Sequence, residues 1–341
     1  TLLCLKPILK ALGATETILP YAVTYAEIYV LSSVFNVFNV TMNSIVTSEG
    51  AAKTTMFALL AGAVFNVILD PVLIYSLDLG VAGAAAATGI SQIFTSLIYM
   101  NYILRKKSLF TFSIKKCCLS KKTMTEIFKI GIPTMVFQLL TSLASALINM
   151  QSREYGDSVI AGMGTVTRIV SMGSLMVFGF VKGFQPIAGY SYGAGNYGRL
   201  QETVRTAILW STVFCVAFGT VLAIFPAPIV ACFTAGDIEM IHVGSCALRA
   251  NGISFLLFGF YTVYSSLYLA LGRAGKGFVL GACRQGICFI PLIFVLPVFM
   301  GENGIFYAQP VADVFAAGAA LFAAVEFRKE LNYRWKGERE E

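Results

Sequence analysis

Nine long hydrophobic stretches recur along the 341-residue chain, and they constrain its fold more than any other feature. Each reaches the ~20 residues that cross the ~30 Å hydrocarbon core of a bilayer as an α-helix. They lack the period-two alternation of barrel strands, so a helical bundle is expected. The expected spans are residues 21–47, 54–77, 81–104, 127–150, 158–181, 205–231, 243–270, 277–300 and 303–327.

The composition of the chain supports membrane spans over buried helices of a soluble protein. Hydrophobic residues make up 57% of the sequence and charged residues only 13%. Ordinary soluble domains carry about 25% charged residues. We therefore expect an all-α integral membrane protein, most of which lies in lipid.

The lysine and arginine residues predict how these spans are oriented. When the chain is threaded back and forth through the nine spans, most of its 25 Lys and Arg residues fall on one side. Positively charged loops are enriched in the cytoplasm, so this side, with the loop 105–126 and the C-terminal tail, is expected to be cytoplasmic. The net charge of +7 then reflects topology, and no nucleic-acid partner is expected.

Few residues of the sequence could perform covalent chemistry or hold a metal. The eight cysteines are scattered without a CxxC pair, and the single histidine, His242, lies at the end of a span. Neither a metal-binding spacing of Cys and His nor a phosphate-binding loop is found. We expect a protein that is not an enzyme and that needs no cofactor.

An internal repeat relates residues 7–90 to residues 228–311, at an offset of 221 to 222 positions. One register aligns three spans and two loops, and it brings Gly50 near Gly272. Copies separated by six spans are parallel. Three further helices are then expected before Thr1. The predicted domains are 1–104 (the last three helices of an N-terminal lobe), 105–126 (cytoplasmic basic linker), 127–327 (six-helix C-terminal lobe) and 328–341 (cytoplasmic tail).

Three stretches of the sequence carry a family resemblance. They read NSIVTSEGAAKTTMFALLAGAVFNVILDPVLIYSLDLGVAGAAAATGISQ (43–92), GIPTM (131–135) and FQPIAGYSYGAGNYGRL (184–200). In this order and spacing they resemble the multidrug and toxic compound extrusion (MATE) family, in particular its bacterial MepA-type and DinF-type branch. The resemblance makes the chain equivalent to helices 4–12 of twelve.

The resemblance to MATE transporters implies a function as well as a fold. It implies two six-helix lobes around a V-shaped cavity, and export of cationic amphiphilic compounds, antibiotics among them, against an inward flow of H⁺ or Na⁺. A monomer in the bacterial plasma membrane is expected, with the lipid bilayer and small lipophilic or cationic substrates as its partners.

Polar residues interrupt the span at 54–77. Asn66 and Asp70 are spaced i, i+4 and share one helix face, about 6 Å apart along the axis. Pro71 cannot donate a backbone hydrogen bond, so it frees the carbonyl of Val67 and kinks the helix. A charged aspartate at this depth costs several kcal/mol unless it is paired, so Asp70 is expected to be neutral part of the time and could carry a proton.

The resemblance assigns these residues to a cation-coupling site. In MATE transporters the aligned Asn and Asp, with a threonine on the next helix that corresponds to Thr88, form the cation site of the N-terminal lobe. The partner carboxylate of the family lies on the first helix, which precedes Thr1. H⁺ is the favoured ion, and Na⁺ at Asp70 remains an alternative. The second copy has Cys288 and Leu292 at the equivalent positions, so coupling is expected in the N-terminal lobe.

Other polar and aromatic residues are weaker candidates for functional sites. Arg168, Gln185 and Asp313 are possible polar sites of the C-terminal lobe, with Arg284 or Arg249 as a partner for Asp313. The possible substrate cavity comprises Phe35, Phe38, Met42, Phe137, Gln138 and Tyr261, although such residues more often pack helices together.

Two other classes of protein remain as alternatives. A lipid-linked oligosaccharide flippase of the same superfamily would share the helical bundle and would use basic cavity residues such as Arg168 and Arg249. A membrane scaffold or receptor without transport is the third class. A buried Asp70 near Asn66 and Thr88 argues against it.

Overall fold

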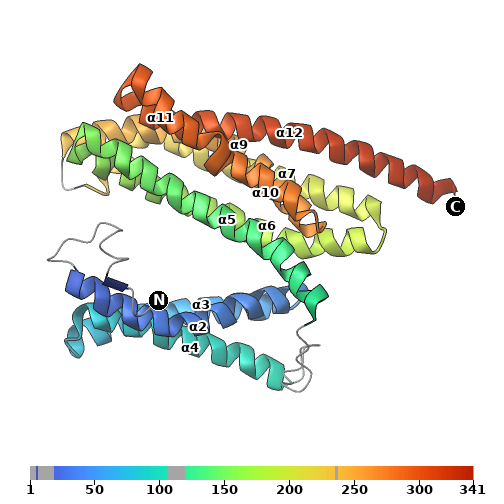
Figure 1. The fold of residues 1–341 in the computed structure, drawn as a ribbon, viewed down its shortest axis with the longest axis horizontal. Helices are drawn as coiled ribbons and strands as arrows, with labels where there is room; N and C mark the ends of the chain where they lie inside the picture. Colours follow the sequence, from blue (N-terminus) through green and yellow to red (C-terminus); the bar gives the residue numbers. More distant parts are fainter. Residues whose placement is uncertain (1–4, 7–18, 106–119, 235–236, 341) are drawn as a thin grey trace. The chain divides into compact units, whose positions relative to one another are not determined.

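The computed structural model describes residues 5–6, 19–105, 120–234 and 237–340 and is all-α, with no strand in these ranges. Nine helical segments in them are long and apolar enough to span a membrane, and each overlaps one expected span. The predicted fold class is therefore confirmed. The elements (Figure 1) are α2 (Leu19–Ser48), α3 (Ala52–Pro71), the π-helical turn η2 (Val72–Ser76), α4 (Gly80–Leu104), α5 (Lys121–Ser152), the 3-10 turn η4 (Arg153–Tyr155), α6 (Asp157–Gly193), α7 (Tyr197–Ile224), α8 (Pro226–Ala231), α9 (Ile238–Ala270), α10 (Ala274–Ala282), the π-helical turn η5 (Cys283–Ile287), α11 (Phe289–Met300) and α12 (Glu302–Glu340).

Several helix boundaries differ from the expected ones. The sixth span was expected to continue to residue 231, but α7 ends at Ile224 and the short helix α8 begins at Pro226. Proline fits the first turn of a helix, where its missing N–H is not needed, and breaks a helix interior. Helix α5 begins at Lys121, within the expected linker, and α12 continues through the expected tail to Glu340. Most of the linker, residues 106–119, lies outside the described residues.

The chain divides into two compact units, Thr1–Cys117 and Cys118–Glu341. In the N-terminal unit, α4 packs against both α2 and α3. Met42, Val46 and Tyr99 fill the interface of the unit, together with Ala58 and Tyr102. A side-chain hydrogen bond from Ser96 Oγ to Asn39 Oδ1, at 2.8 Å, ties α4 to α2 inside the apolar interface. Such buried bonds fix the rotation of helices that are apolar on all faces.

Helix α9 lies at the centre of the C-terminal unit and packs against α6, α7 and α12 (Figure 1). Its closest approach is to α7, through two glycines. A Cβ atom on Gly219 would lie 2.5 Å from the carbonyl oxygen of Gly252, and one on Gly252 would lie 2.9 Å from that of Gly219. Small residues of this kind allow membrane helices to approach through their backbones.

The internal repeat is visible in the backbone of the two units. Gly50 and Gly272 both adopt positive φ, +82° and +74°, at the turn that follows α2 and α9 respectively. The residue after each glycine donates to a carbonyl five positions earlier, Ala51 N to Val46 O at 3.1 Å and Arg273 N to Tyr268 O at 2.8 Å. This is the Schellman pattern of helix termination. The repeats diverge in their π-helical turns, η2 and η5, which lie at different places along the equivalent span.

Candidate functional site

The N-terminal unit has a hollow between α3 and α4 whose lining includes several polar residues. It has a volume of about 180 Å³, and side chains of Asn66, Thr88, Ser91, Gln92 and Thr95 contribute to its wall. Residues 88, 91, 92 and 95 are three and four positions apart, so they form one face of α4. The structure thus brings Asn66 and Thr88, two of the three expected coupling residues, to the same hollow.

Two amide atoms at this hollow are buried without a hydrogen-bond partner among the described residues, Asn66 Nδ2 and Gln92 Oε1. The first is a donor and the second an acceptor. Leaving such atoms unpaired costs about 1–3 kcal/mol each. The hydroxyl group of Thr88 donates to the Ala84 carbonyl at 3.1 Å, which leaves its oxygen free to accept.

Asp70 lies one helical turn after Asn66, in the last turn of α3, and is half-buried. Its side chain is not part of the wall of the hollow. The regular helix ends at the next residue, Pro71, and the chain continues as a π-helical turn in which Leu77 N donates to Val72 O at 3.1 Å. Turns of this type inside helices are frequent at functional sites. The regular α-helix thus gives way to a π-helical turn directly after Pro71.

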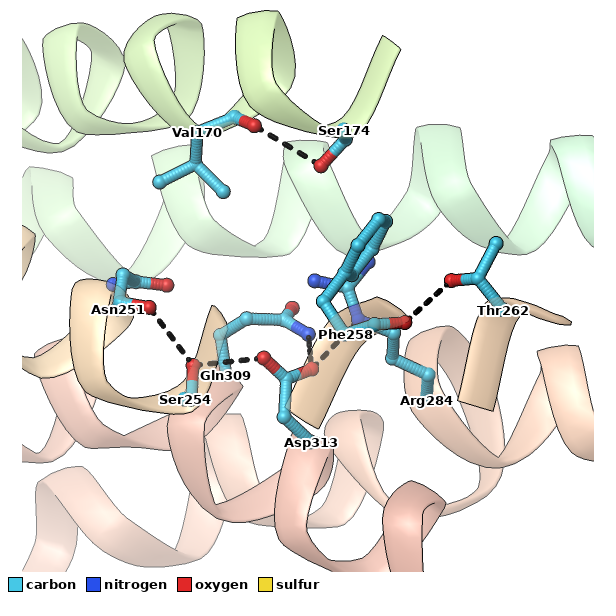
Figure 2. A network of polar contacts seen from close by, with 9 residues as sticks. All are labelled: Val170, Ser174, Asn251, Ser254, Phe258, Thr262, Arg284, Gln309 and Asp313. Carbon is cyan, nitrogen blue, oxygen red and sulfur yellow. Dashed lines mark hydrogen bonds and ion pairs between the residues drawn. The ribbon is translucent and has the colours of Figure 1, made fainter. Parts of the chain in front are cut away.

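The C-terminal unit contains a second polar centre, built around Asp313 of α12 (Figure 2). Arg284 Nε donates to Asp313 Oδ1 at 2.6 Å, and the two side chains are 8% and 3% exposed. Gln309 Nε2 donates to the same oxygen at 2.9 Å, and Ser254 Oγ to Oδ2 at 2.8 Å. The carboxylate thus has three donors. Of the two arginines considered for Asp313, the structure pairs it with Arg284, whereas Arg249 is exposed on α9.

Aromatic rings cover the guanidinium group of Arg284. Its Cζ atom lies 4.8 Å from the centroid of the Phe258 ring and 5.7 Å from that of Tyr261. Arg284 also borders a cavity of about 220 Å³, whose wall includes Phe137, Gln138 and Gln309. No carboxylate from the described part of the chain lines this cavity. The Arg284–Asp313 pair therefore stabilises a charge beside a mostly apolar cavity.

The structure separates the residues expected to line a substrate cavity. Phe137 and Gln138 line the cavity of the C-terminal unit. Met42 is 1% exposed and Tyr261 is 3% exposed, because both pack in the cores of their units. Helix packing, the commoner role of such residues, thus accounts for these two. Phe38 packs against the N-terminal core, and Phe35 is 37% exposed.

The remaining C-terminal candidates do not join the polar centre. Arg168 is exposed on α6, and Gln185 is half-buried on the same helix; neither lines the 220 Å³ cavity. Sequence reasoning missed Gln92 and Gln309. Each is four residues from a candidate that was identified, Thr88 and Asp313, so the i, i+4 spacing would have indicated them.

The hydrophobic helices of the described residues define a multi-pass membrane protein. The MatE family model matches residues 1–72 and 133–295 of the sequence. The chain belongs to this family.

Curated relatives are similar over almost the whole chain. The multidrug export protein MepA of Staphylococcus saprophyticus is 28% identical over 340 residues, which cover 97% of this chain and 73% of the relative. MepA of Staphylococcus haemolyticus is 29% identical, with 95% of this chain and 71% of the relative covered.

Solved structures show the same fold. An outward-facing multidrug resistance MATE transporter of the MOP superfamily aligns with a TM-score of 0.88 at 23% identity, over 98% of this chain and 75% of that one. A MOP superfamily transporter from Pyrococcus furiosus aligns with a TM-score of 0.89 at 22% identity, over 98% and 74%.

Proposed function

We propose that the protein exports lipophilic, cationic drugs from the cell in exchange for an inward-moving ion. The observation that carries this proposal is the similarity to MepA, a multidrug export protein, across 97% of the chain. Hydrophobic helices that enclose half-buried polar groups suit such a transporter, because ionisable residues inside a membrane mark ion and substrate pathways. The protein transports its substrates without covalent chemistry.

The coupling ion binds in the N-terminal unit, at Asp70 with Asn66 and Thr88. Two features support this assignment: Asn66 and Thr88 share one hollow, and Asp70 follows Asn66 by one helical turn. The only other carboxylate at a polar centre described above, Asp313, already accepts three hydrogen bonds, one of them from an arginine. It is therefore a poor carrier of a transported ion.

The coupling ion is H⁺. A hard cation such as Na⁺ requires several oxygen ligands. At the hollow, the hydroxyl oxygen of Thr88 and Gln92 Oε1 can each accept, which is fewer oxygens than such a cation requires, and Asn66 Nδ2 is a donor. A proton needs no such set of ligands, because a single carboxyl group inside the membrane, here that of Asp70, can carry it.

Substrates bind in the cavity of the C-terminal unit, against Phe137 and Gln138. The wall is mostly apolar, and Phe178 also contributes to it. Aromatic faces attract organic cations. Because Asp313 neutralises Arg284 within the polar centre, the arginine repels such a cation less than an isolated charge would.

The flippase alternative is not supported by the positions of its arginines. Arg168 and Arg249 are both exposed, and neither lines the 220 Å³ cavity. The two curated relatives named above are multidrug export proteins as well. A scaffold without transport does not account for unpaired amide atoms around a polar hollow.

The protein acts as a monomer in the plasma membrane of a bacterium, with the loop 105–126 and the C-terminus in the cytoplasm. The distribution of Lys and Arg along the sequence supports this orientation. A fluorescent protein fused to the C-terminus should fluoresce, whereas alkaline phosphatase at the same site should be inactive. Active phosphatase would overturn the orientation.

The function is tested in vesicles that contain the purified protein. We expect an ethidium-like dye to be transported when a pH gradient is imposed and not when a Na⁺ gradient is imposed. Transport driven by Na⁺ alone would overturn the choice of ion. Movement of a fluorescent lipid-linked sugar, with no movement of dye under either gradient, would overturn the proposed function in favour of the flippase.

A further inference from the structure

A groove lies on the surface of the C-terminal unit, with α7 and α12 as its walls and α9 as its floor. It has a volume of about 600 Å³. Phe260 and Tyr264 form the floor, and Ile208 and Leu321 contribute apolar surface to the two walls. The groove is thus a long apolar surface.

Two arginines lie in the part of the groove nearest the start of α7 and the end of the span of α12. Arg205 of α7 and Arg328 of α12 both contribute to its wall, and both are exposed. No carboxylate lines the groove in the described part of the chain. The same groove therefore presents two positive charges next to apolar walls.

Carboxylates on the same turns of α12 have other partners. Glu326 forms an ion pair with Lys276 at 2.5 Å, and Glu330 forms one with Arg273. The side-chain hydrogen bond from Arg273 to Glu330 raises the pKa of the arginine above its usual value. Within the described ranges, neither Arg205 nor Arg328 forms an ion pair. The groove thus retains two positive charges that neighbouring acids do not neutralise.

The position of the arginines along their helices places them near the membrane surface. Arg205 is eight residues from the start of α7, about 12 Å along the axis, and Arg328 is three residues before the end of the span Glu302–Leu331. The helix faces next to the groove are apolar and open: Trp210 of α7 is 60% exposed and Phe322 of α12 is 76% exposed. Arginines near the ends of the spans, next to exposed apolar faces, are suited to contact lipid headgroups and lipid tails respectively.

We propose that this groove binds one anionic phospholipid of the inner leaflet. The phosphate group lies between Arg205 and Arg328, and an acyl chain lies along Ile208, Phe260 and Leu321. Guanidinium groups form paired hydrogen bonds to phosphate oxygens, and basic pockets between membrane helices on the cytoplasmic side suit such headgroups. The lack of a carboxylate in the wall argues against a cationic occupant.

Native mass spectrometry of the detergent-purified protein tests the proposal, with phosphatidylglycerol and phosphatidylcholine as probes. We expect phosphatidylglycerol to bind and phosphatidylcholine to bind much more weakly. The double variant Arg205→Gln/Arg328→Gln should lower the affinity for phosphatidylglycerol about 25-fold, since each basic residue contributes a factor of roughly five to the affinity. The matched control, Lys121→Gln/Lys122→Gln, removes two exposed charges of α5 and should leave this affinity unchanged.

A third variant tests the apolar part of the groove. Ala324→Phe fills the groove at α12 and keeps every charge, so it should also lower the affinity for phosphatidylglycerol. Equal affinity for the two lipids, or an equal loss in the lysine control, would show general surface attraction and overturn the proposal. Two results together would make the site a free-phosphate site instead. Inorganic phosphate would displace phosphatidylglycerol at the same concentration as the lipid, and Ala324→Phe would leave the affinity for the lipid unchanged.

Discussion

Arg284 donates its Nε–H group to Asp313 Oδ1 at 2.6 Å, and this contact joins the π-helical turn η5 to α12 inside the C-terminal unit. Both side chains are almost completely buried. The pair lies in the unit that lacks an equivalent of Asp70, so the N-terminal unit contains a half-buried carboxylate and the C-terminal unit a buried one. Asp313 has an arginine within hydrogen-bonding distance, whereas no ion pair to Asp70 is present among the described residues.

Breaking this pair from one side should destabilise the protein strongly. Asp313→Asn leaves the charge of Arg284 buried and uncompensated, and loss of one partner of a buried ion pair typically costs about 3–5 kcal/mol. We expect thermal unfolding in detergent to shift down by several degrees. The double variant Arg284→Gln/Asp313→Asn should recover much of this loss.

An exposed ion pair provides the control for that experiment. Lys276 and Glu326 lie 2.5 Å apart and are 48% and 47% exposed. Surface pairs contribute about 0–1 kcal/mol, so Glu326→Gln should hardly change the unfolding temperature. If Asp313→Asn changes the unfolding temperature as little as Glu326→Gln does, the buried pair does not stabilise the protein.

Asp70→Asn should abolish ion-driven efflux of dye and leave membrane insertion intact. The amide cannot be ionised, so it cannot exchange a proton during the transport cycle. Dye efflux from cells and the amount of protein in the membrane fraction are the measurements. Asp78→Asn is a suitable control, because Asp78 is exposed in the following turn and has a φ of +50°, a conformation that Asn also tolerates. Normal efflux by the Asp70 variant would contradict the coupling assignment.

Asn66→Leu should separate stability from function. Leucine removes a buried donor that has no partner, so the free energy of unfolding should stay the same or rise by about 1 kcal/mol. Efflux should fall at least tenfold if this amide contacts the coupling group. Ser91→Ala in the same wall should have little effect, because the Ser91 hydroxyl already donates to the Ala87 carbonyl. A stable Asn66→Leu variant with normal efflux would remove the hollow from the mechanism.

Two glycines of α12 should respond differently to alanine. A Cβ atom on Gly304 would overlap the carbonyl carbon of Leu296 and the nitrogen of Pro297, whereas nothing lies within 4 Å of one on Gly318. Gly304→Ala should therefore lower the free energy of unfolding by about 1–3 kcal/mol. Gly318→Ala should be neutral or slightly stabilising, since alanine favours a helix. Equal melting temperatures for the two variants would contradict the close approach at Gly304.

The internal repeat was predictable because it depends on turns that are encoded locally. Gly50 and Gly272 each terminate a helix with positive φ, a conformation for which glycine is favoured. The end of α7 was also encoded locally, since Pro226 and Pro228 follow it, but hydrophobicity alone extended the expected span past them. Hydrophobic length indicates a span, whereas proline decides where its helix stops.

The polar centres were predictable only in part. The sequence identified Asp70, Asn66 and Thr88 by their spacing and resemblance, and it identified Asp313 with two possible partners. The choice of Arg284 over Arg249 depends on which face α9, α12 and the π-helical turn η5 present to one another. Spacing along one helix carries no information about the rotation of another.

The sequence by itself determined the membrane setting, the nine expected spans and the all-α class, because hydrophobic length and local turn residues are properties of short segments. The resemblance of three of its stretches indicated the family. The tertiary structure alone decided that Asp313 pairs with Arg284 and that Asn66 and Gln92 meet at one hollow. In lipid, nearly all faces of a helix are apolar, so hydropathy does not fix its rotation. Close packing at small residues such as Gly219 and Gly252, and buried hydrogen bonds, fix it instead.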